Sequence, residues 1–313
     1  MAGAPLKLEF HAATGELWDD ADRGGTLPRA RWGEILRGLK KLCAAAGVTW
    51  RVVAGKITDQ GGHQGGGDWL VLCTVTAGYH DIFDNWLHYY RKLKLDHDLH
   101  IIAEDALSYA KYSKLVPEYF RGSGGGGGGG GGTVTVVKGV FSAAGLRAAQ
   151  FKSRSFKQLM SRRPAYVLSA LVDEGRNVFY TDSDTVWLAD PVPFCGLTGK
   201  YDIRAPLERP VHAAERLNAG TVCFKNTNAT VRVVRAWRAE LERKPGLNQP
   251  ALNRVLRRYP QTRIEALPRD AFPTGDRYFL KGQRDGAVLV HANWVFTTAQ
   301  KVALLKRAGL WAW

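Results

Sequence analysis

Two aspartates follow a short apolar run in the middle of the chain. Val178, Phe179 and Tyr180 have the aromatic and β-branched character of a buried strand, and Asp182 and Asp184 come just after them. Residues two apart in an extended chain project to the same side, so both carboxylates can face one cation. Such hard oxygen ligands suit Mg²⁺ or Mn²⁺. The residues alone leave two interpretations open, a metal site and a pair of solvated turn aspartates.

The pattern Asp-x-Asp occurs three times, whereas ordinary aspartate usage predicts roughly one chance match in a chain of this length. Asp20 and Asp22 lie in a polar, glycine-flanked segment, and Asp96 and Asp98 precede an apolar run, so both pairs are typical of loops. Only the third pair ends an apolar strand. Carboxylates at strand ends of open α/β sheets lie where ligands bind, which favours this pair.

The segments that must position the pair alternate between strand and helix patterns, which is typical of a parallel sheet. Strands are expected at 69–76, 99–103, 133–137 and 177–181, and helices at 81–93, 104–113 and 156–173. Pro164 predicts that the third helix starts at or near that residue. Further strands are expected at 201–205, 218–225, 263–267 and 287–290, and further helices at 230–243, 249–259 and 300–307.

Composition describes a globular chain. Its 313 residues are 45% hydrophobic and 23% charged. No stretch approaches the roughly 20 apolar residues of a membrane span, and the N-terminus has no signal-peptide pattern, so no membrane span is expected in the chain. The chain has four widely spaced cysteines, Cys43, Cys73, Cys195 and Cys223, and no Cys-x-x-Cys pattern. This spacing argues against a zinc site or a dense disulfide framework, and it leaves the redox compartment open.

The formal charge of +15 attracts anionic partners such as nucleic acid, acidic polysaccharide or phosphorylated small molecules. The basic residues are spread over several helix-like segments and form no single arm. Neither a compact basic face with interleaved aromatics nor a known nucleic-acid motif is present, so no nucleic-acid partner is expected.

Domain organisation follows from the same patterns. Residues 1–66 form a poorly defined N-terminal segment, and residues 67–313 form one domain. A run of nine glycines begins at Gly124, and we expect a flexible loop insertion over 122–132 because strand-helix alternation continues directly after it.

Six ordered blocks between about Trp69 and Trp313 carry a family resemblance: Leu168 to Pro193, Asn218 to Gly220, Asn248 to Asn253, Leu267-Pro268 with Phe272 to Gly275, His291 to Trp294, and Lys301 with Gly309 to Trp311. In these blocks the chain resembles nucleotide-diphospho-sugar transferases of the plant and algal cell-wall type, glycosyltransferase family 77. The resemblance implies an α/β fold of the GT-A type, a Rossmann-like nucleotide-sugar-binding domain with a mixed central sheet flanked by helices. It also implies sugar transfer with retention at the anomeric carbon.

The resemblance assigns a metal-dependent site. Asp182, Asp184 and His291 would bind Mn²⁺ or Mg²⁺, and Lys301 would contact the diphosphate of a UDP-sugar donor. The nucleotide side of the site would use residues at strand and helix ends, namely Thr76, Ala77, Tyr79, Asp105 and Arg163. For Asp105 a helix cap is an equal alternative, and for Arg163 a solvated helix start.

The catalytic positions implied by the resemblance are Asp184, Asn218 and Gln249, with Gln249 facing the anomeric carbon. The family often has an acid before this glutamine, where the chain has Asn248, and glycine where it has Thr297. These departures and the glycine run keep a catalytically silent, glycosyltransferase-like scaffold open as the alternative function, and a basic nucleic-acid-binding protein is the less favoured alternative.

Partners and location also follow from the resemblance alone. The donor sugar would be galactose, xylose or arabinose, and the acceptor a glycan or glycoprotein, with an acidic glycan giving part of the positive charge a use. Relatives act in the Golgi lumen in cell-wall biogenesis behind an N-terminal anchor, and neither an anchor nor a signal peptide is visible in this sequence.

Overall fold

The structure is a computed structural model that describes residues 7–11, 16–19, 24–26, 49–53, 69–120, 132–139, 153–196, 200–208 and 217–313. The first Asp-x-Asp pair and the glycine loop expected at 122–132, apart from Gly132, lie outside these residues. No helix in the described part of the chain is long and apolar enough to cross a membrane.

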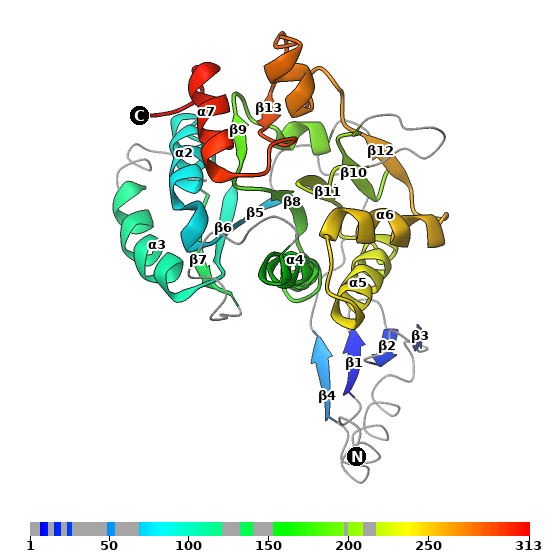
Figure 1. The fold of residues 1–313 in the computed structure, drawn as a ribbon. Helices are drawn as coiled ribbons and strands as arrows, with labels where there is room; N and C mark the ends of the chain where they lie inside the picture. The colour runs from blue at the N-terminus through cyan, green and yellow to red at the C-terminus, as the bar shows by residue number, and fades with distance from the viewer. Residues whose placement is uncertain are drawn as a thin grey trace.

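A seven-stranded mixed sheet, with strand order β12-β10-β11-β8-β5-β6-β7, forms the centre of the molecule (Figure 1). Four neighbouring strands, β8, β5, β6 and β7, are parallel, whereas β11 runs antiparallel to both of its neighbours. The strands are β5 (Trp69–Val75), β6 (Asp98–Ala103), β7 (Val134–Lys138), β8 (Asn177–Thr181), β10 (Ile203–Ala205), β11 (Thr221–Phe224) and β12 (Ile264–Ala266).

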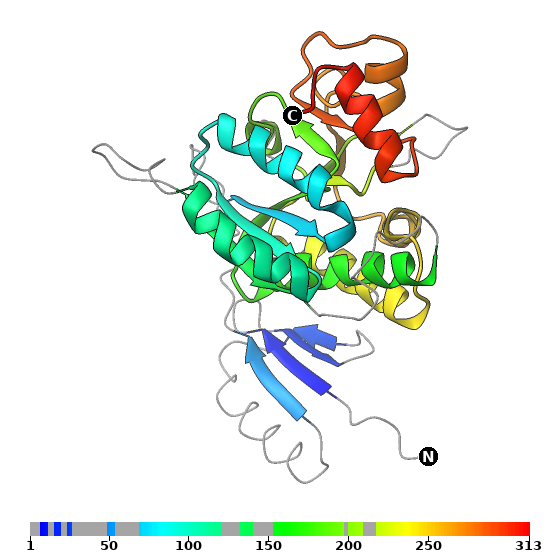
Figure 2. The same ribbon diagram turned by 60° about the vertical axis from the view of Figure 1, so that its left-hand side comes forward.

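Helices cover both faces of this sheet, as Figure 2 shows. The helices α2 (His80–Lys92) and α3 (Ala106–Tyr119) share one hydrophobic cluster with the sheet. The helices α4 (Arg154–Val172), α5 (Asn228–Arg243) and α6 (Asn248–Arg258) share the cluster on the other face. The predicted mixed sheet flanked by helices is therefore confirmed.

The alternating direction of side chains along each strand explains why both faces of the sheet have a hydrophobic cluster. In β5, Leu70 and Leu72 belong to the cluster under α4, whereas Val71 and Cys73 belong to the cluster under α2. Each of these four side chains is at most 1% exposed. A strand buried on both faces needs such a continuous apolar run, which is the pattern that made the central strands readable in the sequence.

A smaller layer lies beyond one edge of the sheet. It consists of β9 (Thr185–Trp187), β13 (Leu289–His291), the π-helical turn η5 (Asp276–Leu280) and α7 (Thr298–Arg307). The strands β9 and β13 pair antiparallel, and Val186, Val290 and Leu304 share a third hydrophobic cluster. In Figure 1 the η5, β13 and α7 part of this layer, drawn in orange and red, stands above the sheet. It therefore brings residues near position 300 to the strand that follows the aspartates.

The prediction that a helix starts at Pro164 is wrong. The helix α4 begins at Arg154, where the Ser153 hydroxyl accepts a hydrogen bond from Phe156 N, and Pro164 lies inside it. An N-terminal serine cap and a long buried face outweigh the cost of one proline, which removes one backbone hydrogen bond. The other predicted helices and strands of residues 69–313 are present, with ends shifted by a few residues.

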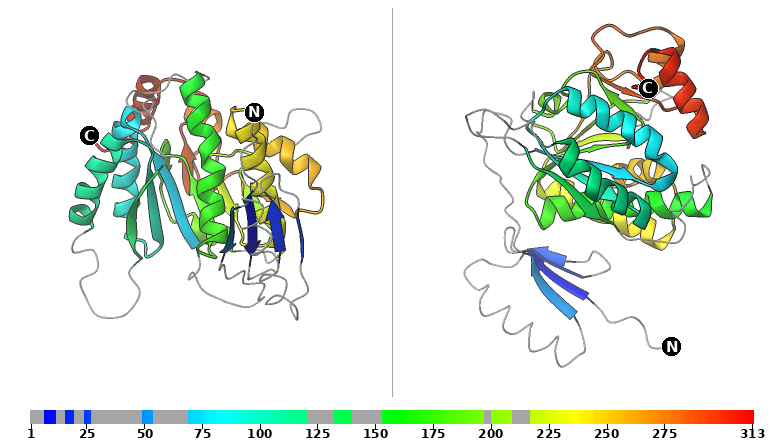
Figure 3. Two further views of the ribbon diagram at one scale, coloured as in Figure 1. Left: turned by 90° about the horizontal axis from the view of Figure 1, so that it is seen from below. Right: turned by 90° about the vertical axis from the view of Figure 1, so that its left-hand side faces the viewer.

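The N-terminal segment contributes a separate four-stranded sheet, visible in Figure 3. Its strand order is β3-β2-β1-β4, and its members are β1 (Lys7–His11), β2 (Glu16–Asp19), β3 (Gly24–Thr26) and β4 (Thr49–Val53). The division of the chain at residue 66 stays a prediction.

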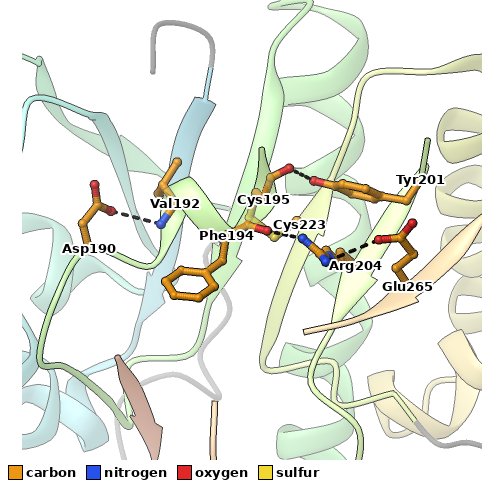
Figure 4. The surroundings of a disulfide bond; sticks show 8 residues. All are labelled: Asp190, Val192, Phe194, Cys195, Tyr201, Arg204, Cys223 and Glu265. Atoms are coloured by element: carbon orange, nitrogen blue, oxygen red, sulfur yellow. Dashed lines mark hydrogen bonds and ion pairs between the residues drawn. A yellow bond between two sulfur atoms is a disulfide. The ribbon is translucent and has the colours of Figure 1, made fainter. Parts of the chain in front are cut away.

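A disulfide that the cysteine spacing did not predict joins Cys195 to Cys223 (Figure 4). Cys195 ends the short helical turn η4 (Val192–Cys195), and Cys223 lies within β11, so the bond ties the segment after β9 to the sheet. The Tyr201 hydroxyl donates to the Cys195 carbonyl, and Arg204 donates to the Phe194 carbonyl. Both cysteines are fully buried.

Candidate active site

The two aspartates lie in a tight turn between β8 and β9. The backbone N–H of Thr185 donates to the Asp182 carbonyl at 3.3 Å, and the Thr185 hydroxyl donates to the same oxygen at 2.9 Å. The expectation that both carboxylates project together from an extended strand is therefore wrong in its geometry, because β8 ends at Thr181. The turn nonetheless brings the carboxylates of Asp182 and Asp184 together.

His291 reaches the aspartates through strand pairing. In the antiparallel register of β13 and β9, His291 stands opposite Thr185, one residue after Asp184. Its Nε2 lies 3.1 Å from Asp184 Oδ1 and 3.9 Å from Asp182 Oδ2. The backbone N–H of Ala292 donates to the Asp184 carbonyl at 2.9 Å, so the turn and the histidine strand are fixed to each other.

Two cations and a tyrosine hold the outer oxygens of the carboxylates. Arg163 Nη1 of α4 donates to Asp182 Oδ1 at 2.6 Å, and the Tyr180 hydroxyl donates to the same oxygen at 2.9 Å. Lys301 Nζ of α7 donates to Asp184 Oδ2 at 2.6 Å. One oxygen of each carboxylate therefore accepts hydrogen bonds from neighbouring side chains, and the other oxygen faces His291.

The remaining donors fit a divalent cation. One ligand atom each from Asp182, Asp184 and His291 lie within 4.8 Å of one another, and this is the one such cluster of three among the residues that the structure describes. Two carboxylate oxygens with one imidazole nitrogen suit Mn²⁺, and also Mg²⁺ with water as further ligand. Arg163 and Lys301 balance the two negative charges and fix the carboxylate orientation, the usual task of groups around metal ligands.

Gly220 lets the chain before β11 pass directly beside these ligands. A Cβ at this position would lie 2.5 Å from His291 Cε1 and 2.6 Å from Asp182 Oδ2. The Gly220 carbonyl also accepts the Asp182 N–H at 2.7 Å. Gly220 therefore allows the backbone to lie close to the ligands, since any side chain here would displace two of the three proposed ligands.

The charged groups of the cluster shift the pKa values of Asp184 and His291. Burial opposes ionisation of Asp184, but the charges of Lys301 and His291 outweigh it and hold the pKa of Asp184 well below its usual value. Burial likewise disfavours the imidazolium of His291, and Asp184 outweighs burial and raises the pKa of His291 above its ordinary value. Asp184 is thus held ionised, as a metal ligand must be.

A cleft of about 350 Å³ opens over this cluster. It is lined by eight of the residues assigned from the sequence, which come from six separate parts of the chain: Thr76, Tyr79, Arg163, Asp182, Asp184, Gln249, His291 and Lys301. Apolar side chains of α4 line it as well, namely Phe156, Leu159 and Met160. The cleft thus joins a charged floor to an apolar wall.

Three of the assigned residues, Ala77, Asp105 and Asn218, do not line this cleft. Asp105 is buried and caps α3 by accepting from Ser108 N at 2.8 Å, and it also accepts from Ala77 N at 2.7 Å. The helix-cap alternative for Asp105 is therefore what the structure contains. Asn218 is buried beside the cleft, where its Oδ1 accepts from Gly220 N at 2.7 Å. Asn218 thus holds the glycine that touches the ligands.

Arg163 and Lys301 occupy positions that differ from the sequence interpretation in detail. Arg163 lies inside α4 with a buried side chain on Asp182, so the alternative of a solvated helix-start arginine is wrong. Lys301 is buried and donates to both Asp184 and the Ala292 carbonyl, the latter at 2.6 Å. Their contacts with a donor stay predictions.

Sequence reasoning missed several residues that line the cleft, chiefly Glu104, Glu208, Trp294 and Phe296. Glu104 follows the apolar strand β6 directly, the same signal that singled out the aspartates after β8. Burial raises the pKa of Glu104 to about 7, against the opposing charges of Arg163 and Arg162. The cleft therefore contains a carboxylic acid that is neutral over much of the range below neutral pH.

Comparison with known families gives a match over residues 137–305, more than half of the chain, to the sequence profile described as nucleotide-diphospho-sugar transferase. The chain is 27% identical over 271 residues to UDP-D-xylose:L-fucose alpha-1,3-D-xylosyltransferase 3 of Arabidopsis thaliana, covering 77% of the chain and 66% of that protein. A second Arabidopsis xylosyltransferase of the same description matches equally, with 69% of its length covered. The chain thus spans about two thirds of the length of these relatives.

Among solved structures, the apo form of the glycosyltransferase GlyE of Streptococcus pneumoniae is similar in fold, with a TM-score of 0.50 at 14% identity over 77% of this chain and 60% of that one. This similarity shows the fold alone. The resemblance stated from the sequence blocks and the GT-A type of α/β fold are confirmed.

Proposed function

Because the chain belongs to the nucleotide-diphospho-sugar transferase family, we propose that it is a metal-dependent retaining glycosyltransferase acting from a nucleotide-diphosphate donor on a glycan or glycoprotein. The observation that carries the proposal is the cluster of Asp182, Asp184 and His291 at the floor of the cleft. The relatives are named for a UDP-D-xylose donor and an L-fucose acceptor, so these sugars are the first to test, before galactose and arabinose donors.

Binding of the donor diphosphate is the first task of the site. A Mn²⁺ held by Asp182, Asp184 and His291 would neutralise negative charge on the leaving diphosphate. Lys301 uses two ammonium hydrogens on Asp184 and Ala292, which leaves a third for a phosphate oxygen. Arg163 orients Asp182 by donating to its Oδ1. Together these residues give the position of the diphosphate, and with it the anomeric carbon.

Gln249 is the group that we assign to the sugar. Its Oε1 accepts from the backbone N–H of Ala219 at 3.3 Å, and the side chain lines the cleft. An amide cannot act as a carboxylate nucleophile, but a fixed amide dipole can orient the sugar and stabilise positive charge that develops at the anomeric carbon. In this proposal Asn218 acts indirectly, by holding Gly220 against the metal ligands.

An oxidising compartment suits the protein. The buried bond between Cys195 and Cys223 is of the kind found in secreted and lumenal proteins and rare in the cytosol. The disulfide supports a lumenal or extracellular location, of which we propose the Golgi lumen, whereas the proposed role in cell-wall biogenesis rests on the family resemblance.

The test is release of UDP from UDP-xylose, UDP-galactose and UDP-arabinose, with Mn²⁺ and with a chelator. We expect slow, metal-dependent hydrolysis of one donor in the absence of acceptor, and faster release when a methyl glycoside of L-fucose is added. Absence of metal-dependent release with every donor and acceptor would refute the enzyme assignment.

A catalytically silent scaffold remains the second candidate, because Asn248 stands where the family often has an acid. The other departure has a structural account, since the Thr297 hydroxyl caps α7 by accepting from Gln300 N at 3.2 Å. A scaffold would show raised thermal stability with UDP and Mn²⁺ but no UDP release, because ligand binding alone stabilises the folded state.

A further inference from the structure

The loop between β13 and α7 exposes two large aromatic side chains inside the cleft. Trp294 is 41% exposed and Phe296 is 59% exposed, and both line the cleft over the proposed metal site. Six large hydrophobic side chains are exposed in the part of the chain that the structure describes, and only these two belong to the cleft. Exposed apolar surface grouped in a cleft points to a binding partner.

The backbone of Trp294 is strained. Its φ is +68°, a conformation that bulky residues rarely adopt, and of the described residues other than glycine only Lys94 shares a positive φ. Such strain persists where the surroundings enforce it, often at functional sites. Folding alone therefore does not explain why a tryptophan occupies a backbone conformation that favours glycine.

Hydrogen bonds on both sides of the tryptophan enforce this conformation. On one side the Lys301 ammonium donates to the Ala292 carbonyl, and the Asn293 Oδ1 accepts from Gly275 N at 2.7 Å. On the other side Gln300 Oε1 accepts from the N–H groups of Phe296 and Thr297, at 3.3 and 3.2 Å. The loop is thus fixed at both ends before any ligand arrives, which preorganises the aromatic rings.

We propose that Trp294 and Phe296 form a stacking surface for the sugar ring of the acceptor. This inference rests on the proposed function. A pyranose has one face covered by C–H groups, and an aromatic ring buries that face while the hydroxyls stay hydrogen-bonded. Trp294 follows the proposed metal ligand His291 by three residues, so the surface lies in the same cleft as the reaction centre.

The depth of the side chains separates this surface from the donor. Asp182, Asp184 and Lys301, which we assign to the metal and diphosphate, have side chains only 17%, 13% and 7% exposed. The aromatic pair is far more exposed and therefore lies nearer the mouth of the cleft. A ligand at the mouth can enter after the donor is in place, as an acceptor must.

The experiment compares Trp294→Gly and Trp294→Phe with the parent protein and with Trp313→Ala, a control at an exposed tryptophan outside the cleft. Glycine removes the ring and relieves the positive φ, so this variant should fold. Binding of methyl glycosides of L-fucose and D-galactose is measured by saturation-transfer NMR with UDP and Mn²⁺ present. UDP affinity is measured separately by calorimetry.

We expect Trp294→Gly to weaken glycoside binding about tenfold and Trp294→Phe by roughly two- to threefold, because the smaller ring retains part of the stacking area. UDP affinity should stay unchanged in both variants, and Trp313→Ala should match the parent. If Trp294→Gly fails to fold, Phe296→Ala, at a position without positive φ, should still weaken glycoside binding severalfold.

Two outcomes would overturn the stacking surface. One is glycoside binding that is unchanged by these substitutions or undetectable in the parent. The other is a parallel loss of UDP affinity, which would assign the rings to the donor. Failure of the proposed function is a separate result, because it would show as absent metal-dependent UDP release in the parent protein itself.

Discussion

Two Asp-x-Asp pairs lie at opposite ends of one sheet. Asp98 is the first residue of β6, with Asp96 just before it, whereas Asp182 and Asp184 follow the last residue of β8. Both strands run parallel to β5, so their starts share one edge of the sheet and their ends share the other. The two Asp-x-Asp pairs therefore have the same spacing but lie in different surroundings.

The pair at the amino edge is used by the fold itself. Asp98 accepts from Thr133 N at 2.8 Å and from Arg176 Nη1 at 2.9 Å, and His97 between the two aspartates pairs with Asp190 at 2.8 Å. At the carboxyl edge, β13 and α7 add a histidine and a lysine to the pair. Asp-x-Asp spacing alone therefore does not define a site, because the edge of the sheet at which the pair lies decides which groups join it.

The largest expected effect is at the carboxyl edge. Asp184→Asn removes a charged side chain that we propose as a metal ligand, at nearly constant volume, and we expect Mn²⁺-dependent UDP release to fall roughly a thousandfold, the scale of losing a principal electrostatic contact. Circular dichroism should show an unchanged fold. Retained activity with the parent's metal dependence would remove the distinction between the two edges.

The other end of β6 gives a pH-dependent test. The pKa of Glu104 is raised to about 7, so the folded state favours the neutral acid. Its contribution to stability is fully present below the unfolded pKa of about 4.3 and is lost as pH rises through about 7, by up to about 4 kcal/mol. Glu104→Gln should therefore resemble the parent at pH 4 and be more stable at pH 8.

Denaturant unfolding at the two pH values measures this difference. A Glu104→Gln variant whose stability relative to the parent is the same at pH 4 and pH 8 would show that the carboxyl is not held neutral. Glu118→Gln, at an exposed position on α3, provides the control.

His291 tests the contribution of the C-terminal layer. His291→Ala removes one of three proposed ligands but leaves both carboxylates with Arg163 and Lys301, so we expect the Mn²⁺ concentration for half-maximal rate to rise about tenfold. A Mn²⁺ titration of UDP release measures it. An unchanged titration would mean that β13 adds no ligand to the aspartates.

The smallest effect is expected at the amino edge. Asp98→Asn weakens a partly exposed pair with Arg176, and we expect a stability loss of about 0.5–1 kcal/mol with UDP release within twofold of the parent. Thermal unfolding and the release assay provide the two values. A loss of activity comparable to that of Asp184→Asn would make the two pairs equivalent and refute the comparison.

Much of the fold was readable because burial imposes local patterns. The continuous apolar runs of β5, β6 and β8 and the strand-helix alternation predicted the central sheet, and the position of the aspartates after an apolar strand predicted the site. The Pro164 prediction failed because the buried face of α4 and the cap at Ser153 outweigh a local proline preference.

The apolar runs in the sequence indicated that the central strands are buried and that two carboxylates follow β8. What meets these carboxylates depends on tertiary packing, since the register of β13 on β9 places His291, and α4 and α7 bring Arg163 and Lys301 onto the outer oxygens. The bond between Cys195 and Cys223 and the exposure of Trp294 in the cleft were likewise set by tertiary contacts. Residues distant in sequence leave no periodic signal, because their contacts depend on how separate elements pack together.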